Sequence, residues 1–289
     1  MELAIISGKG GTGKSSVAAA FATIESNVVL ADCDVDAANL FLLFNPENEE
    51  EEVFIDSHKA VVDHEKCTLC GICTEVCRFD AITQKEDKII IDEILCDGCF
   101  LCSRVCPEQA ITMEKNDDSR MFTGSFRNGR MVYGWLAPGE ENSGKLVNLI
   151  RDKVKKIAEE NNISHIIIDG PPGTGCPVIS AITGIDKVLI VTEPTISGLN
   201  DMKRTIELVK GFRAKAMVMI NKYDLNEIIT KQIENHCNSL DIPVVGKLPF
   251  DQEVTKAMLN CKSIIEWNPG SDTSKELVKI WDRIANTDS

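Results

Sequence analysis

A glycine-rich loop near the start of the chain limits its fold more than any other segment. It follows the short apolar run Leu3–Ile6 and precedes a stretch with apolar residues at helical spacing. Glycines allow backbone N–H groups to close around phosphate groups, a lysine neutralises their charge, and a hydroxyl can bind Mg²⁺. The sequence therefore predicts a phosphate-binding loop between a strand and a helix. Its expected nucleotide-binding residues are Gly8, Lys9, Gly10, Gly11, Thr12, Gly13, Lys14, Ser15 and Ser16.

Short β-branched strands alternate with helical segments in both outer parts of the chain. This alternation predicts an α/β domain with a mostly parallel sheet, helices on both faces, and a ligand site at the carboxyl ends of the strands. The expected strands are Leu3–Ile6, Asn27–Ala31, His165–Ile168, Lys187–Val191, Ala216–Ile220 and Pro243–Val245. The expected helices begin near Ser15 and span 147–158, Met202–Val209, Glu227–Leu240 and Ser274–Ala285, while the acidic run 47–52 is expected to be a solvated loop.

The alternation breaks between residues 57 and 117, where eight of the twelve cysteines cluster. The pattern C-x₂-C-x₂-C-x₃-C occurs twice there, with the second copy displaced by 29 positions. A unit of about 29 residues is too small to fold without a metal or disulfide staple, and clustered cysteines without secretory features favour metal. We therefore expect an inserted domain at 57–117, between host segments 1–56 and 118–289, with residues 118–144 forming a hairpin that leads back to the host.

The doubled run resembles the bacterial two-cluster ferredoxins, which bind two [4Fe-4S] clusters with these spacings. The resemblance implies an α+β insert in which the fourth cysteine of each run crosses to the other cluster. Arg78 stands where such runs usually have proline, which alters the loop without removing a ligand. The implied ligand sets are Cys67, Cys70, Cys73 and Cys106 for one cluster, and Cys96, Cys99, Cys102 and Cys77 for the other.

The second lysine of the glycine-rich loop resembles that of the deviant Walker A ATPases, namely the MinD and ParA proteins, nitrogenase iron protein and the Mrp-type iron–sulfur carriers. The resemblance implies a P-loop ATPase that binds ATP and Mg²⁺. It also implies a nucleotide-sandwich dimer, formed with itself or with a paralogue, in which Lys9 reaches the partner's phosphates. Lys9 and Lys14 are thus expected to be catalytic; the alternative for Lys9 is a solvated loop lysine.

Carboxylates at the ends of two expected strands match the switch segments of this family. By resemblance, Asp34 positions the attacking water, while Asp32 and Asp169 hold Mg²⁺ together with the Ser15 hydroxyl. Asp36 is an alternative for either role. Asn221, Pro249, Phe250 and Asp251 resemble the residues that surround adenine in related ATPases. The segment from Asn221 to Asp224 also matches the N-K-x-D guanine motif, so GTP is the alternative nucleotide.

These motifs predict an ATPase that couples dimer closure to electron transfer or metallocluster maturation on a redox partner protein. Alternatives are an Mrp-like cluster carrier, although Cys237 and Cys261 are single, or a MinD-like positioning ATPase, although the last expected helix carries mixed charges. We expect Cys33 and Cys176 to be small buried residues. The net charge of −14 argues against nucleic acid and anionic membrane as partners. Without an apolar run of transmembrane length or a signal peptide, a cytoplasmic protein is expected.

Overall fold

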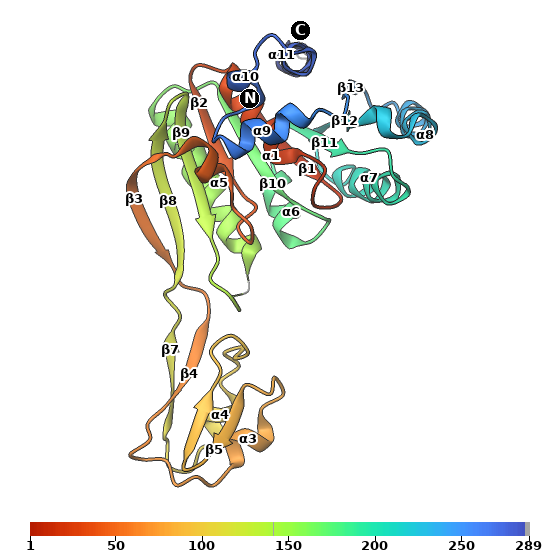
Figure 1. The fold of residues 1–289 in the computed structure, drawn as a ribbon. Helices are drawn as coiled ribbons and strands as arrows, with labels where there is room; N and C mark the ends of the chain where they lie inside the picture. Colours follow the sequence, from red (N-terminus) through yellow and green to blue (C-terminus); the bar gives the residue numbers. More distant parts are fainter. Residues whose placement is uncertain (141, 287–289) are drawn as a thin grey trace. The chain divides into compact units, whose positions relative to one another are not determined.

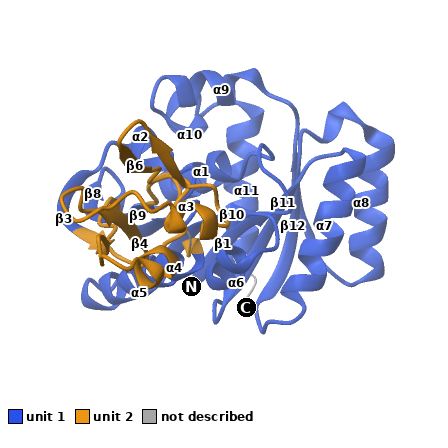
Figure 2. Cartoon of the chain, turned by 90° about the horizontal axis from the view of Figure 1, so that it is seen from below, with its two compact units in different colours: residues 1–51, 121–134, 144–289 blue, residues 52–120, 135–143 orange. Residues whose placement is uncertain are grey.

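The computed structural model describes residues 1–140 and 142–286. It contains two compact units, which Figure 2 distinguishes by colour. The first unit comprises Met1–Glu51, Met121–Gly134 and Gly144–Ser289, and the second comprises Glu52–Arg120 and Trp135–Ser143. The insert expected at 57–117 lies within the second unit. No helix in the described residues has the length and apolar character needed to cross a bilayer.

Within the described residues, one nine-stranded sheet forms the centre of the first unit (Figure 1). Its strands are β1 (Glu2–Ser7), β2 (Val28–Asp32), β3 (Glu47–Phe54), β8 (Ser119–Phe126), β9 (Gly129–Trp135), β10 (His165–Pro172), β11 (Lys187–Thr192), β12 (Lys215–Asn221) and β13 (Val244–Leu248). Their order is β13-β12-β11-β1-β10-β2-β9-β8-β3. Every pairing from β13 to β9 is parallel, which confirms the predicted α/β class.

Helices surround this sheet and bury both of its faces. Along β1, Leu3 and Ile5 join a core cluster with α1, α10 and α11, while the alternating Ala4 and Ile6 are equally buried. Because successive strand residues point to opposite faces, both faces must be covered. The helices are α1 (Lys14–Ile24), α2 (Leu40–Phe44), α5 (Ser143–Glu160), α6 (Cys176–Ile182), α7 (Ile196–Val209), α8 (Glu227–Ser239), α9 (Gln252–Leu259), α10 (Ile264–Trp267) and α11 (Asp272–Asn286).

The acidic run 47–52 was expected to be a solvated loop, and that prediction is wrong, because Glu47–Phe54 forms strand β3. It is the last strand in the sheet order and is paired only with β8. Glu49 accepts hydrogen bonds from Arg130 at 2.7 and 2.9 Å, and Glu50 pairs with Lys153. Charged side chains on an edge strand hinder pairing with other chains, so glutamates are compatible with this position. The expected hairpin is present as β8 and β9, which are neighbours joined by two residues.

The second unit repeats one supersecondary motif. The first copy contains β4 (His58–Val62), α3 (Ile72–Val76) and β5 (Ile82–Lys85), and the second contains β6 (Lys88–Ile91), α4 (Leu101–Val105) and β7 (Ile111–Lys115). The helices are displaced by the same 29 positions as the cysteines. Strand β4 pairs with β7 and β5 with β6, both antiparallel, so each small sheet takes one strand from each copy. Neither copy is therefore complete alone.

Candidate functional site

The glycine-rich loop joins β1 to α1 as the sequence predicts. Gly13 has φ of 95°, and a Cβ there would lie 2.5 Å from Asn221 Nδ2. A Cβ on Gly8 would lie 2.5 Å from Asp201 Cβ. Side chains are thus excluded at both ends of the loop, because one position has a left-handed backbone and both are crowded. Lys14 is buried at the start of α1 and lines a pocket together with Gly10, Gly11 and Gly13 of the loop.

Two carboxylates end parallel strands beside this loop. Asp32 accepts backbone N–H groups of Asp34, Asn39 and Leu40 at 3.0–3.2 Å, yet burial raises its pKa to about 6. Asp169 is also buried; burial and the nearby Asp32 raise its pKa to about 8, while Lys14 and Ser15 oppose the shift. Both carboxylate oxygens of Asp169 lack a hydrogen-bond partner among the described residues. An unpaired buried carboxylate beside a hydroxyl is the donor set that suits Mg²⁺ bound together with phosphates and water.

Asp34 and Asp36 line the same open pocket as Lys14 and Ser15. Asp34 is partly buried, and burial raises its pKa, opposed by the charge of Lys14. Asp36 is exposed. The pocket therefore contains both candidates for the water-positioning residue, and Asp34 is the one that interacts with the phosphate lysine.

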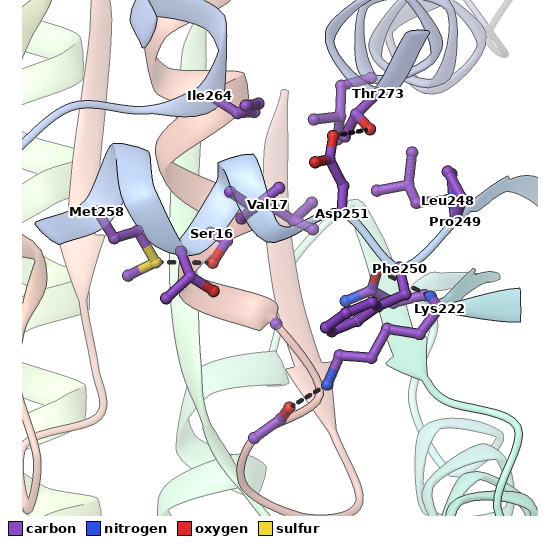
Figure 3. A pocket seen from close by; sticks show the side chains of 16 residues that line it. Ser16, Val17, Lys222, Leu248, Pro249, Phe250, Asp251, Met258, Ile264 and Thr273 are labelled. Atoms are coloured by element: carbon purple, nitrogen blue, oxygen red, sulfur yellow. Dashed lines mark hydrogen bonds between the residues drawn. The ribbon is translucent and has the colours of Figure 1, made fainter. Parts of the chain in front are cut away.

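A second pocket shares part of the loop with the first and is lined by the residues expected around adenine (Figure 3). Asn221 donates its amide to the Thr12 carbonyl at 2.8 Å, which fixes the strand end against the loop. Asp251 caps α9 and accepts the Thr273 hydroxyl at 2.6 Å. Asp224 accepts the Phe250 N–H at 2.7 Å. One oxygen of this carboxylate thus holds the backbone of Phe250, a residue of the pocket wall.

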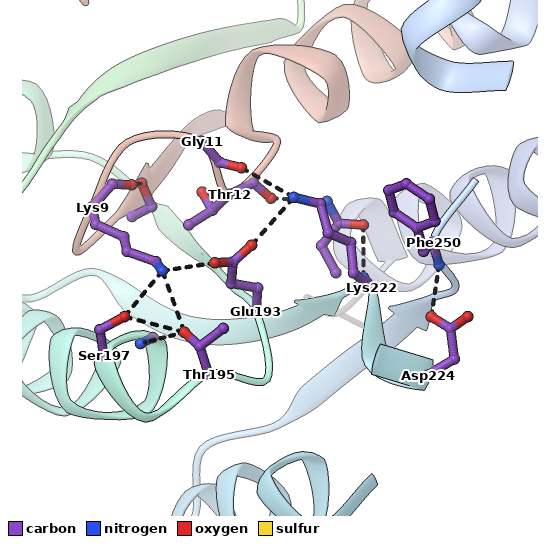
Figure 4. A network of polar contacts seen from close by, with 12 residues as sticks. Lys9, Gly11, Thr12, Glu193, Thr195, Ser197, Lys222, Asp224 and Phe250 are labelled. Carbon is purple, nitrogen blue, oxygen red and sulfur yellow. Dashed lines mark hydrogen bonds and ion pairs between the residues drawn. The ribbon is translucent and has the colours of Figure 1, made fainter. Parts of the chain in front are cut away.

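Lys9 lies in a network that the sequence analysis did not find (Figure 4). Its Nζ is 2.6 Å from Glu193 Oε1 and donates to the Ser197 hydroxyl at 3.1 Å. Glu193 also pairs with Lys222 at 3.2 Å, and Lys222 donates to the Gly11 carbonyl at 3.3 Å. Glu193 directly follows β11, whose carboxyl end lies at the same sheet edge as those of β2 and β10. That position was the available signal, and we missed it because no motif includes this glutamate.

The eight clustered cysteines line two cavities in the second unit, four in each. The cavities also differ in one wall, since Glu108 lines one cavity and Phe79, at the equivalent position of the repeat, lines the other. All twelve cysteines are free thiols. The first cavity contains Cys67, Cys70, Cys73 and Cys106, and the second contains Cys77, Cys96, Cys99 and Cys102. Each cavity thus takes three cysteines from one copy of the repeat and one from the other.

The four remaining cysteines divide evenly between core and surface. Cys33 is fully buried between the strand-end carboxylates, and burial raises its pKa well above the usual range. Cys176 is exposed, so the expectation of a small buried residue is wrong there: it is the first residue of α6, directly after a glycine turn. Cys237 is buried and Cys261 is exposed.

The family model for the CobQ/CobB/MinD/ParA nucleotide-binding domain matches residues 3–264. The match covers most of the chain, including the glycine-rich loop, Asp32, Asp169 and Glu193. The chain belongs to this family. Membership confirms the predicted enzyme class, a MinD/ParA-family ATPase.

Relatives of this MinD/ParA-family chain include two uncharacterised proteins of Methanocaldococcus jannaschii. One is 36% identical and covers 98% of this chain and 96% of its own length. The other is 31% identical and covers 97% and 98%. Among solved structures, MinD of Pyrococcus horikoshii complexed with Mg-ADP has a TM-score of 0.60 at 19% identity and covers 100% of this chain and 97% of its own. The Aquifex aeolicus MinC:MinD complex gives 0.55 at 17%, covering 99% and 96%.

Proposed function

We propose that this MinD/ParA-family ATPase uses ATP-driven dimer closure to control electron transfer or metallocluster maturation on a partner protein. The observation that carries the proposal is that one chain combines a phosphate-binding loop with two cavities of four free cysteines each. In this proposal, residues 57–117 form a ferredoxin-like insert within host segments 1–56 and 118–289. Nucleotide binding and redox chemistry then belong to separate units of one polypeptide.

ATP with Mg²⁺ is the proposed nucleotide. ATP is favoured over GTP because Asn221, Pro249, Phe250 and Asp251, the residues expected around adenine, all line one pocket beside the loop. Lys14 would neutralise phosphate charge, and Ser15 with Asp169 would hold Mg²⁺, assisted by Asp32. Asp34 would position the attacking water. The solved MinD structure of Pyrococcus horikoshii contains Mg-ADP and shares this fold, which supports the same class of ligand here.

The proposal includes a nucleotide-sandwich dimer, with itself or with a paralogue. Lys9 would then contact the partner's phosphates, and its ion pair with Glu193 at 2.6 Å would have to open first. Because Glu193 also pairs with Lys222, its carboxylate would keep one cationic partner after the ion pair with Lys9 opens. The Aquifex aeolicus relative assembles with MinC, which supports a protein partner here without identifying it.

Two [4Fe-4S] clusters are the proposed cofactors of the insert. Within the described residues, no three His, Cys, Asp or Glu side chains are grouped closely enough to hold a single metal ion. Each cavity offers four cysteine thiols, three from one cysteine run and one from the other, which is the donor set that a two-cluster ferredoxin uses for each cluster. When bound, such clusters supply one-electron chemistry.

Anaerobically purified protein is expected to contain about eight iron and eight sulfide per chain. Cys106→Ser should lose the cluster of the first run, because Cys106 lies in the cavity of Cys67, Cys70 and Cys73. No more than about four iron per chain should remain. Cys176→Ser, which removes an exposed cysteine outside the insert, is the matched control and should retain all eight. Stoichiometric zinc without iron after anaerobic reconstitution would contradict the cluster proposal.

Coupling between nucleotide and clusters is tested by an anaerobic redox titration followed by electron paramagnetic resonance. A coupling free energy of about 1–3 kcal/mol corresponds to roughly 40–130 mV for a one-electron centre. We expect Mg-ATP, or an analogue that is hydrolysed slowly, to shift the potential by an amount in this range. Equal potentials and spectra in all nucleotide states, with unchanged hydrogen exchange in residues 57–117, would reduce the insert to a passive electron carrier.

The two alternative functions have less structural support. An Mrp-type carrier needs a late pair of cysteines, but Cys237 is buried and Cys261 is exposed. A MinD-like membrane helix needs a free apolar face. In α11, Leu277, Ile280 and Trp281 are buried in the core of the first unit instead.

A further inference from the structure

The internal repeat of the second unit duplicates its cysteines but not its surface. Three apolar residues near the second cysteine cavity have charged counterparts in the other copy of the repeat, 29 positions away. Phe79 corresponds to Glu108, Ile94 to Glu65 and Leu95 to Lys66. Leu101 corresponds to Ile72, which is apolar as well. The exposed fraction is 39% for Phe79, 64% for Ile94, 51% for Leu95 and 36% for Leu101. We name these four residues the apolar face.

Three of these four residues have no apolar counterpart at the first cysteine set, whereas Ile72, the counterpart of Leu101, lines the first cavity. Phe79 and Leu101 line the second cavity together with Cys77, Cys96, Cys99 and Cys102, and Ile94 and Leu95 directly precede Cys96. Glu108 occupies the corresponding wall of the first cavity. Two copies of one sequence that keep their ligands but differ in surface polarity do not serve equal roles. Exposed apolar groups that gather at one site indicate protein contact.

From this asymmetry we propose that the apolar face is where an electron-transfer partner docks, and that this partner has an apolar centre with a basic rim. The inference rests on the proposed function, since it takes the second cysteine set to hold a cluster. Asp92, Glu93 and Asp97 are exposed beside Ile94 and Leu95. Residues 57–117 contain twelve acidic and seven basic side chains. Opposite charge on the partner speeds encounter and sets its orientation.

A second copy of the chain is a poorer occupant of the apolar face. A symmetric dimer places the same patch on both sides of the interface, so the acidic group of Asp92, Glu93 and Asp97 would be brought close to the same acidic group of the other copy. Like charges brought together at an interface are unfavourable. The acidic rim therefore selects a different, basic protein.

The test uses a lysine-rich cytochrome c as a basic redox probe and a neutral quinone as a small oxidant. The full-length protein is reduced anaerobically with dithionite and separated from excess reductant, and stopped-flow absorbance then measures oxidation. One electron passes from the reduced protein to each ferric haem, which becomes ferrous. The rate with cytochrome c should fall as ionic strength rises, because steering between unlike charges is screened.

The double variant Ile94→Ser/Leu95→Ser should transfer electrons to cytochrome c about tenfold more slowly, with an unchanged rate to the quinone. The matched control is Glu65→Ser/Lys66→Ser at the repeat-equivalent positions, which should change both rates less than twofold. Glu93→Lys should slow the cytochrome reaction and weaken its salt dependence. Because these side chains are exposed, the variants should keep their fold.

Iron and sulfide are measured in each protein first. Parent protein without iron would overturn the proposed function and this docking surface with it. Intact iron content with equal rates for both double variants would overturn the docking surface alone. Sedimentation that shows a dimer dissociated only by Ile94→Ser/Leu95→Ser would also overturn it, in favour of a second copy as the occupant.

Discussion

Replacing Lys14 with alanine is expected to raise the Kd for Mg-ATP by about 10²-fold or more and to lower kcat/KM by about 10³-fold. Lys14 is buried at the start of α1, and its charge stabilises the ionised forms of Asp34 and Asp169. Without it, the two carboxylates lose a positive charge that offsets their own beside the proposed phosphate site. Calorimetric titration with a slowly hydrolysed ATP analogue measures the binding loss directly.

Lys9→Ala is the matched control, because it removes the same charge from the same loop. It should retain much of the binding, since Lys9 is held by Glu193 and Ser197 rather than at the start of α1. Hydrolysis and nucleotide-dependent dimerisation should fall instead. If Lys9→Ala hydrolyses ATP at the parent rate as a monomer, the sandwich-dimer proposal fails.

Asp169→Asn is expected to lower the rate of Mg²⁺-dependent ATP hydrolysis by about 10³-fold or more and to stabilise the nucleotide-free protein. The folded-state pKa of Asp169 is raised from 3.8 to about 8, so its ionisation opposes folding. The protonated Asp169 carboxyl therefore contributes free energy of unfolding that is fully present below pH about 4 and is lost as the pH rises to about 8. An amide at this position removes that loss. The melting temperature at pH 7.5 should rise by about 5 °C.

Melting temperatures measured from pH 4 to pH 8.5 provide the check. The parent protein should lose stability across this range, and Asp169→Asn should lose less; Asp32, with its pKa raised to about 6, contributes the remaining slope. Asp34→Asn serves as control, because that side chain is only partly buried: it should lose hydrolysis with little change in the pH dependence of stability. An Asp169→Asn protein with parental activity would contradict its role at Mg²⁺.

Local patterns predicted the host fold well because its strands are short, apolar and buried on both sides. The carboxyl ends of β1, β2 and β10 then had to bring Lys14, Asp32 and Asp169 to one edge. The resemblance to two-cluster ferredoxins implied the same division of the cysteines that the two cavities show. These features depend on chain periodicity, which the sequence displays directly.

Features that depend on distant partners were missed. Strand β3 looked like a solvated loop because its glutamates pair with Arg130 and Lys153, about 80 and 100 residues away. Helix α7 begins at Ile196, earlier than its apolar stripe suggested, because the Thr195 side chain accepts the Gly198 N–H as a cap. The roles of Glu193 and Lys222 became visible only when the strand ends were placed beside the loop.

The sharing of cysteines between the two halves of the insert has a consequence for how that unit matures. Each cavity takes its fourth thiol from the other half, so the proposed cluster in either cavity would close a long chain loop and lower the entropy cost of forming the other. Assembly should therefore be cooperative, with half-loaded molecules rare. Newly made chains starved of iron would keep both halves open to proteases, so cells would accumulate either finished protein or fragments.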